Sequence, residues 1–389
     1  MAIVQAGSPR RPLLVGAVGL LAGLSLLLMG GCRGSNDNTA EGHGPIKISY
    51  IGLTCEPPIF VAYEKGFFKE EGLDVELVKT SWDELKEGLG MGRFDATHHL
   101  VMYLVKPIEN GLDIKITGGI HTGCLKVQVG VNSNIKKVED LKGKKIGVPV
   151  LGSPPFLFAS RVLAAHGLDP QKDVTWVRYA PDAMELALKN GEIEVVADAE
   201  PIGTILQAHG AARTLVDQAL DAPYKDEFCC AVVVSGQFYR RNPEGAAKVT
   251  KALIKGAKWV QENKMAAAKL AVEKHYLAAT PELNAQAIRN LQYVPSISKC
   301  RQNIDQIAEE MKKAGFLKKS TKPEALAKAA WADLPGVTDD WIQSVKVEKV
   351  PGGGNPPALD ALAYGNLFRV RLTAARPRSC CSPGSCCAP

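Results

Sequence analysis

Four cysteines of this 389-residue chain lie in short loop-like stretches, and each stretch comes after an apolar run. They are Cys55 in GLTCEPP, Cys124 in GGIHTGC, and the adjacent Cys229 and Cys230 in DEFCC. A buried cysteine often acts as a small apolar residue, which explains any one of these thiols. It explains four at similar positions poorly. Because thiolates select soft ions, the pattern indicates a site for a thiophilic metal, a metalloid or an organometallic compound.

Histidines and other polar residues occur in the same stretches. His98 lies in DATHH, where we expect it to begin a helix, and His121 lies in GGIHTGC. Imidazole is a common metal ligand. Glu56 follows Cys55 directly. Ser153, in LGSPP, precedes a predicted helix, where it can cap the first turn or lie beside backbone N–H groups that bind an anion. The helix cap alone is the simpler interpretation.

The end of the chain carries a second group of thiols. The sequence RSCCSPGSCCAP places Cys380, Cys381, Cys386 and Cys387 around a Ser-Pro-Gly-Ser turn. Four thiols so close together can bind one soft metal ion or form two disulfides, or the tail can be dispensable. A glycine- and proline-rich stretch precedes them, and we expect residues 346–389 to form a flexible linker and a cysteine-rich tail.

The elements that position these residues alternate between strand and helix. Strand-like stretches at 46–53, 73–80, 94–99 and 113–120 are separated by helical stretches. The same alternation restarts at 140–168 and continues to about residue 200. After residue 236 the chain becomes strongly helical. This order predicts an α/β protein with two lobes, each built on a mostly parallel sheet.

The N-terminal segment has the order of a secretory signal. Arg10 and Arg11 precede an apolar run from about Pro12 to Met29, and two glycines follow before Cys32. The alternative is a membrane-spanning helix, since the run approaches the minimum length for one, roughly 18 residues. MGGC resembles the lipobox of bacterial lipoproteins. This predicts a signal peptide over 1–31, lipidation of Cys32, a linker over 32–45, and a lipid-anchored protein outside the cytoplasmic membrane.

The net charge and the number of cysteines bear on two questions, whether the protein binds nucleic acid and whether its thiols pair. The net charge of +6 arises mainly from the arginines of the signal and the tail, so the globular part offers no basis for a nucleic-acid-binding surface. The chain has ten cysteines, and nine remain once Cys32 is lipidated. An odd number leaves at least one thiol free or paired outside the chain. Disulfides remain the default alternative to metal binding in an oxidising compartment.

Four stretches support a resemblance to a family. PPIFVAYEKGFFKEEGLDVELV, GRFDAT, LKGKKIGVP and ALKNGEIEVVADAEP resemble sequences of ABC-importer solute-binding proteins. Within them, the resemblance is to the group for nitrate, sulfonates, taurine and the thiamine pyrimidine precursor. It covers roughly residues 46–260. It implies a bilobed type II periplasmic binding protein fold whose two hinge crossings lie near VGVNSN and VVVSGQ. Lobe 1 would comprise 46–130 and 236–345, and lobe 2 would comprise 131–235.

The resemblance also implies a function and partners. The chain would capture a small ligand between its lobes and deliver it to a membrane permease powered by a cytoplasmic ATPase, acting as a monomer and not as an enzyme. The family usually has an apolar residue near Asp198, so this acid suggests a cationic or metal-bearing ligand. No cofactor is expected apart from a soft metal held by thiolates. Three alternatives remain open: a conventional organic or oxyanion ligand, an enzyme similar to the pyrimidine synthase, and a surface metal chelator.

The lipid-anchor hypothesis predicts the behaviour of one variant. Cys32→Ser removes the thiol that would be acylated, so we expect the protein to move from the membrane fraction to the soluble extracytoplasmic fraction. Fractionation and immunoblotting measure this. A variant that stays in the membrane fraction as the wild type does would instead identify the segment as a spanning helix.

Overall fold

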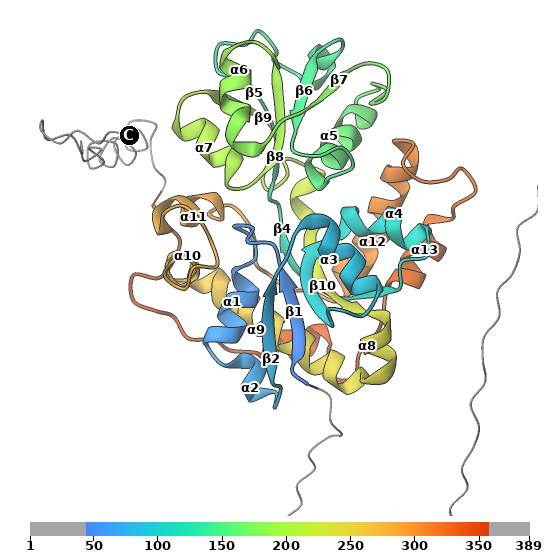
Figure 1. The fold of residues 1–389 in the computed structure, drawn as a ribbon, viewed down its shortest axis with the longest axis vertical. Helices are drawn as coiled ribbons and strands as arrows, with labels where there is room; N and C mark the ends of the chain where they lie inside the picture. Colours follow the sequence, from blue (N-terminus) through green and yellow to red (C-terminus); the bar gives the residue numbers. More distant parts are fainter. Residues whose placement is uncertain (1–43, 358–389) are drawn as a thin grey trace, which may run out of the picture. The chain divides into compact units, whose positions relative to one another are not determined.

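Residues 44–357 are described by a computed structural model, and they form two α/β lobes, each with a five-stranded sheet (Figure 1). The sheet of lobe 1 has the order β2-β1-β3-β10-β4. Its first elements are β1 (Ile46–Tyr50), α1 (Pro57–Glu64), α2 (Phe67–Glu70), β2 (Val75–Lys79), α3 (Trp82–Gly90), β3 (Ala96–Leu100), α4 (Val101–Glu109) and β4 (Ile114–Thr122).

Lobe 2 has a sheet of the same size, in the order β7-β6-β8-β5-β9. Its strands are β5 (Leu125–Gly130), β6 (Lys145–Val148), β7 (Thr175–Arg178), β8 (Val195–Ala199) and β9 (Ala212–Asp217). Its helices are η1 (Val138–Leu141), α5 (Pro154–Ala165), η2 (Pro181–Ala183), α6 (Met184–Lys189), α7 (Ile202–Ala208) and η3 (Tyr224–Asp226).

The chain then returns to lobe 1 through β10 (Phe228–Ser235) and a series of helices. These are α8 (Gly236–Arg241), α9 (Pro243–Glu262), α10 (Lys264–Glu273), α11 (Pro281–Ala287), α12 (Ser298–Lys313), α13 (Pro323–Ala330) and α14 (Asp339–Ser344). Buried apolar side chains of both lobes form one continuous core cluster, and a small second cluster lies under α6 and α7. Among the described residues, none of the helices has the length and apolarity needed to cross a membrane.

The α/β bilobed architecture is confirmed, but the sheets are mixed rather than mostly parallel. In lobe 1, β1 pairs in parallel with β2 and β3, whereas β10 is antiparallel to both β3 and β4. Lobe 2 repeats this arrangement, with β5 antiparallel to β8 and β9. In each sheet the antiparallel strand is the one that enters directly from the other lobe. The direction of a crossing strand cannot be read from its hydropathy.

The crossings between the sheets lie earlier in the chain than expected. β5 belongs to lobe 2 and β10 to lobe 1, whereas the expected boundaries placed both strands in the opposite lobes. Only Gly123 and Cys124 separate β4 from β5. Because this connection is so short, the pattern of apolar residues gives no sign of where the chain leaves lobe 1. Gly123 has φ 74°, and an added Cβ would lie 2.5 Å from the Cβ of Ala219. This glycine permits the turn between the sheets.

Two further expectations change for local reasons. The helix expected over 59–72 is divided into α1 and α2 at Gly66, whose φ of 81° favours glycine. Residues 346–357, expected to begin a flexible linker, are held against α9 and α10. Val350 N–H donates to Asn263 Oδ1 (2.7 Å), and Met265 N–H donates to the carbonyl of Gly354 (3.0 Å). Cys32, the signal segment and the tail cysteines lie outside the described residues.

A buried ion-pair network joins the lobes. Arg161, on α5 of lobe 2, donates to both carboxylate oxygens of Glu227 at 2.7 and 2.6 Å. It also donates to Glu310 on α12 of lobe 1. The side chains of Arg161 and Glu227 are 0 % and 1 % exposed. The paired geometry satisfies charges that would be costly to bury alone.

Removal of Arg161 therefore should destabilise the protein. Arg161→Met keeps most of the side-chain volume but leaves Glu227 buried without its partner, and breaking such a pair costs about 3–5 kcal/mol. Arg240→Met is the matched control, because the pair of Arg240 with Asp113 is exposed and such pairs contribute up to about 1 kcal/mol. Urea unfolding measures both. Equal losses in the two variants would contradict the assigned role.

Candidate functional site

The cysteines predicted to converge do so, at the junction of the two lobes. The Sγ atoms of Cys55, Cys124 and Cys230 all lie within 4.8 Å of one another. Cys229 adjoins them, with its Sγ 2.9 Å from that of Cys124. The four side chains are at most 3 % exposed. Each comes from a different place in the fold: Cys55 precedes α1, Cys124 lies between β4 and β5, and the pair begins β10.

Two histidines complete this group, which we call the thiol–imidazole cluster: Cys55, His98, His121, Cys124, Cys229 and Cys230. A ligand nitrogen from each of His98 and His121, with the Sγ of Cys230, forms a second set within 4.8 Å. The two imidazole rings meet edge to face, with centroids 5.1 Å apart. In the described part of the chain, both ring nitrogens of His98 and the Nε2 of His121 lack hydrogen-bond partners. Buried polar atoms without partners mark a site that is open to a ligand.

Strand register explains why these side chains meet. His98 lies within β3 and does not begin a helix as expected. β10 lies between β3 and β4, with Cys230 opposite His121 and Val232 opposite His98. Residues two apart on a strand share a face, so Cys230 points to the same side as both histidines. His99 points to the other side and packs against Trp82 and Tyr103.

Burial keeps the imidazole of His98 in its neutral, metal-binding form. Burial, reinforced by the neighbouring His121 and His99, lowers the pKa of His98 well below its usual value. Burial raises the pKa of Cys124 to about 11, and its hydrogen bond to Cys229 acts in the same direction. Burial also opposes ionisation of Cys229, but hydrogen bonds from Cys124 and Cys230 outweigh it and lower the pKa of Cys229 to about 7. The cluster therefore contains thiols of unequal acidity.

Glu56, which the sequence suggested as a ligand-binding residue beside Cys55, makes hydrogen bonds within its own loop. Its carboxylate accepts hydrogen bonds from the backbone N–H groups of Gly52 and Leu53 (each 2.7 Å) and of Ile51. Burial and the nearby Cys55 nevertheless raise its pKa to about 8. Glu56 holds the loop between β1 and α1, and this loop positions Cys55.

Ser153 and Asp198 lie in lobe 2 and do not belong to the thiol–imidazole cluster. Ser153 precedes α5, and its buried Oγ makes neither a cap nor any other hydrogen bond in the described structure. Asp198 is the second-last residue of β8 and lies opposite Lys126 of β5 in the sheet. The Lys126 ammonium forms ion pairs with Glu200 and Asp217. Burial raises the pKa of Asp198 to about 7. Asp198 thus lies beside a charged group of lobe 2 formed by Lys126, Glu200 and Asp217.

Tyr293 is a neighbour of the cluster that the sequence did not indicate. It is fully buried, its ring lies 5.0 Å from that of His121, and its hydroxyl donates to the carbonyl of Cys55 at 3.3 Å. It comes from the segment between α11 and α12, about 170 residues after His121. A tyrosine in an irregular segment carries no periodic signal that could have identified it.

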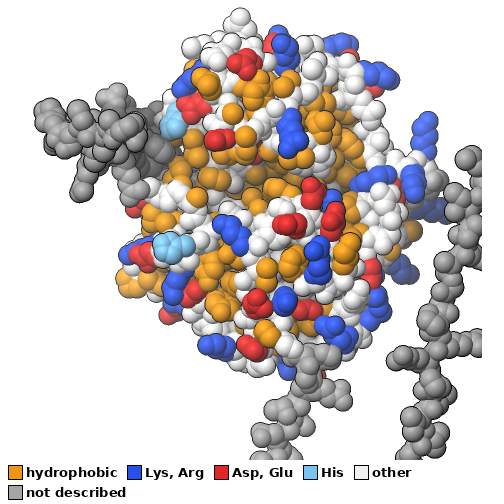
Figure 2. All heavy atoms as spheres, viewed as in Figure 1, with side chains coloured by type: hydrophobic (Ala, Val, Ile, Leu, Met, Phe, Trp, Pro, Cys, Tyr) orange, Lys and Arg blue, Asp and Glu red, His pale blue; other side chains and the backbone are white. Residues whose placement is uncertain are grey.

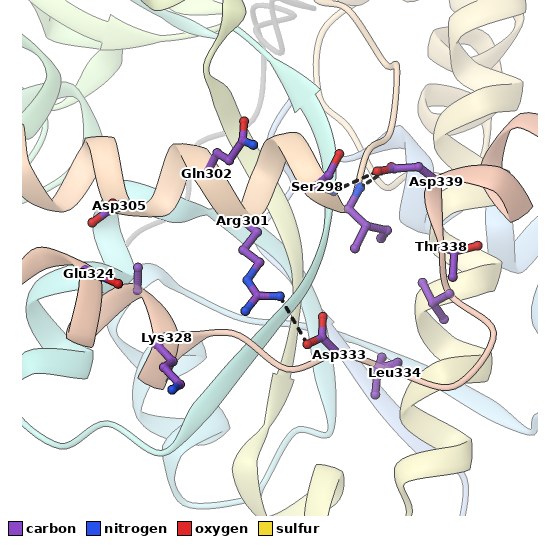
Figure 3. A pocket seen from close by; sticks show the side chains of 13 residues that line it. Ser298, Arg301, Gln302, Asp305, Glu324, Lys328, Asp333, Leu334, Thr338 and Asp339 are labelled. Carbon is purple, nitrogen blue, oxygen red and sulfur yellow. Dashed lines mark hydrogen bonds and ion pairs between the residues drawn. The ribbon is translucent and has the colours of Figure 1, made fainter.

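None of the six cluster residues lines any of three surface pockets in the described part of the chain, although Tyr293, the neighbour of the cluster, lines one of them. A pocket of about 680 Å³ lies between α12, α13 and the segment before α14 (Figure 3). It is lined by both charged and apolar side chains, and Arg301 lies 3.4 Å from Asp333 across it. No histidine or cysteine lines it. In Figure 2, hydrophobic side chains gather in a band between the upper and lower lobes. The chemically distinctive site of the described structure is the enclosed one.

Comparison with known proteins places this bilobed chain in a family. The chain belongs to the NMT1-like family, whose model matches residues 39–273. It is 26 % identical over 274 residues to a nitrate/nitrite-binding protein of a Nostoc species, covering 64 % of this chain and 61 % of that one. It is 29 % identical over 247 residues to a protein of Bacillus subtilis named as a putative aliphatic sulfonates-binding protein, covering 61 % and 72 %.

Solved structures agree on the fold. The periplasmic nitrate-binding protein of Synechocystis superposes with a TM-score of 0.63 at 20 % identity, over 77 % of this chain and 91 % of that one. The alkanesulfonate-binding protein of Xanthomonas axonopodis bound to MOPS superposes with a TM-score of 0.62 at 18 % identity. The match covers 75 % of this chain and 99 % of that one. A yeast 4-amino-5-hydroxymethyl-2-methylpyrimidine phosphate synthase is also related in sequence, at 24 % identity over 258 residues, covering 61 % and 72 %. The fold is therefore that of a periplasmic binding protein.

The burial of Asp198 makes a testable contribution to stability. Its pKa is about 7 in the folded protein and about 3.9 in an unfolded chain. Between these values the folded state binds more protons, so the stability that Asp198 contributes falls as pH rises. Asp198→Asn should remove this slope. We expect the variant to be more stable than the wild type at pH 8, by at most about 4 kcal/mol.

Asp169→Asn is the control with the opposite sign. Backbone N–H donation from Gln171 lowers the pKa of Asp169, so this carboxylate stabilises the fold above its unfolded pKa, and the variant should be less stable at pH 8. Chemical unfolding from pH 4 to pH 8 measures both. An Asp198→Asn variant that keeps the slope of the wild type would contradict the assignment.

Proposed function

We propose that this protein is the extracytoplasmic solute-binding component of an ABC importer. Membership of the NMT1-like family, the bilobed fold and the relatives named for nitrate, nitrite and sulfonate binding support this function. Its partners would be a membrane permease and a cytoplasmic ATPase, and Cys32 would anchor it to the membrane as a monomeric lipoprotein. The binding-protein relatives favour solute capture over the synthase activity named for the yeast relative.

We further propose that the ligand is a thiophilic metal ion, metalloid or organometallic compound. The observation that carries this proposal is the convergence of Cys55, Cys124 and Cys230, all buried, to within 4.8 Å. Three thiols and two imidazoles are soft or borderline donors. An oxyanion such as nitrate needs hydrogen-bond donors and positive charge, which this cluster provides poorly.

One observation favours a second candidate, an organic anion or oxyanion. In the described structure, the buried Oγ of Ser153 and the buried side-chain amide of Gln218 have no hydrogen-bond partners. Both lie on the lobe 2 side, near the start of α5 and after β9. Polar donors of this kind suit the ligands for which the relatives are named. An organometallic anion would combine the two kinds of contact, with its metal bound by the thiols and its anionic part hydrogen-bonded by Ser153 and Gln218.

The tail cysteines extend the metal hypothesis. Cys380, Cys381, Cys386 and Cys387 would capture soft metal and pass it to the cluster, in keeping with their spacing. Because these thiols would compete in any measurement, experiments on the cluster are best done in a full-length background with serine at Cys32 and at these four positions. We call this chain the five-serine background.

The ligand hypothesis predicts the effect of one substitution in that background. Cys55→Ser keeps the shape of the side chain and removes one soft donor, so we expect binding of arsenite, a three-coordinate thiophilic probe, to be lost under reducing conditions. The thermal midpoint should change little. Calorimetric titration and thermal melts measure these two properties.

Cys300→Ser is the matched control, because Cys300 is equally buried but lies on α12, outside the two ligand sets. It should bind arsenite as the background does. Arsenite binding that survives Cys55→Ser would refute the thiol site. Nitrate or an alkanesulfonate binding where arsenite does not would establish the second candidate. A structural disulfide would instead show as lost stability, by roughly 2–4 kcal/mol.

A further inference from the structure

The thiols of Cys124 and Cys229 are in close contact. Their Sγ atoms are 2.9 Å apart, whereas a disulfide bond is about 2.05 Å long. Cys124 lies on the first crossing between the lobes, and Cys229 lies just after the second. A movement of roughly 1 Å would bring the two sulfur atoms to bonding distance.

Other pairings are less favourable. Cys229 and Cys230 are neighbours in the chain, and their Sγ atoms lie 3.9 Å apart, farther than the 2.9 Å between Cys124 and Cys229. The Sγ atoms of Cys55, Cys124 and Cys230 lie within 4.8 Å of one another and form the thiol ligand set, so a bond between any two of them would remove two of its donors. Cys300 belongs to neither set. The geometry therefore selects Cys124 and Cys229.

This pairing would change the donors that remain in the cluster. The two ligand sets share Cys230, but only the thiol set, Cys55–Cys124–Cys230, includes Cys124. A bond between Cys124 and Cys229 removes one of its three donors. The second set, His98–His121–Cys230, keeps all of its donors. Three thiolates suit a soft three-coordinate ion, whereas two imidazoles and one thiolate suit Zn²⁺ with an open position.

We propose that Cys124 and Cys229 form a reversible disulfide that selects between these two ligand sets. Reduced protein would bind thiophilic ions on Cys55, Cys124 and Cys230. Oxidised protein would lose that site and keep the imidazole–thiolate site for a borderline ion such as Zn²⁺. The proposal rests on the proposed function, since it concerns the choice of ligand at the same site.

The chemistry is thiol–disulfide exchange with an organic disulfide. Since the cluster thiols are at most 3 % exposed, the exchange requires the two lobes to part and admit the organic disulfide. One cysteine thiolate then attacks the disulfide and forms a mixed disulfide, which releases the first small thiol. The second cysteine then attacks the protein sulfur and releases the other small thiol. The two protein S–H bonds are lost and one S–S bond forms. Their two protons and two electrons end on the two released thiols, so the organic disulfide is reduced. An extracytoplasmic location supplies oxidants of this class.

The test uses the five-serine background, reduced with dithiothreitol or oxidised with oxidised glutathione and then freed of reagent. Peptide mapping should locate the new disulfide between residues 124 and 229. Native mass spectrometry and calorimetry then measure arsenite and Zn²⁺ binding. We expect reduced protein to bind arsenite. Oxidised protein should lose arsenite binding and retain Zn²⁺ binding, and dithiothreitol should restore the arsenite site.

Three variants separate the parts of the proposal. Cys229→Ser removes the disulfide partner but no member of either ligand set, so it should keep arsenite binding after treatment with oxidised glutathione. Cys300→Ser should respond to oxidation as the background does. His98→Gln should lose Zn²⁺ binding in the oxidised form and keep arsenite binding in the reduced form. Thermal melts of each variant confirm that it is folded.

The results distinguish the failure of this proposal from that of the proposed function. A reduced background that binds no arsenite refutes the ligand class, whatever disulfide forms. If the reduced protein binds arsenite, the ligand class stands, and three results each overturn the switch: no 124–229 disulfide, a different pairing, or undiminished arsenite binding in the oxidised protein. Loss of arsenite binding in oxidised Cys229→Ser also overturns it.

Discussion

The position of β10 between β3 and β4 is the constraint on which the candidate site depends. β10 is antiparallel to both neighbours, and its register places Cys230 opposite His121 on one side and Leu100 on the other. Irregularities in the pairing with β4 occur on both sides of Cys230, where bulges commonly re-aim side chains. A shift of one residue would turn Cys230 away from both histidines and bring Cys229 in its place.

Burial then determines the chemical character of the cluster. The side chains of Cys55, Cys124, Cys230, His98 and His121 are nearly inaccessible, so water contributes little to their hydrogen bonding. A buried site makes unpaired charge costly and favours the neutral form of His98. Lobe 2 presents a different group in Lys126, Glu200 and Asp217, where charges are paired. The two lobes thus offer soft donors on one side and polar groups on the other.

The family and the thiol–imidazole cluster suggest different classes of ligand. Relatives are named for nitrate, nitrite and sulfonate binding, ligands that need hydrogen-bond donors. This chain has kept the two-lobed scaffold and placed thiols where the strands cross. A fold does not determine the ligand, because the ligand is chosen by side chains on the scaffold. The interlobe ion pairs of Arg161 with Glu227 and Glu310 lie next to these thiols, because Glu227 is two residues before Cys229.

The sequence by itself predicted the two α/β lobes, the family and the convergence of Cys55, Cys124, Cys229 and Cys230, because apolar periodicity and loop position are local properties. It also selected His98 and His121. The tertiary structure decided what depends on contacts between distant residues. These contacts moved the lobe crossings to Gly123 and the segment before β10, gave Glu56 its role in the loop, and held residues 346–357 against α9 and α10. They also placed His98 beside His121 in the cluster and His99 on the other side of β3, against Trp82 and Tyr103. Strand direction and register decide which side chains meet, and both are set by pairing partners more than 100 residues apart in the chain.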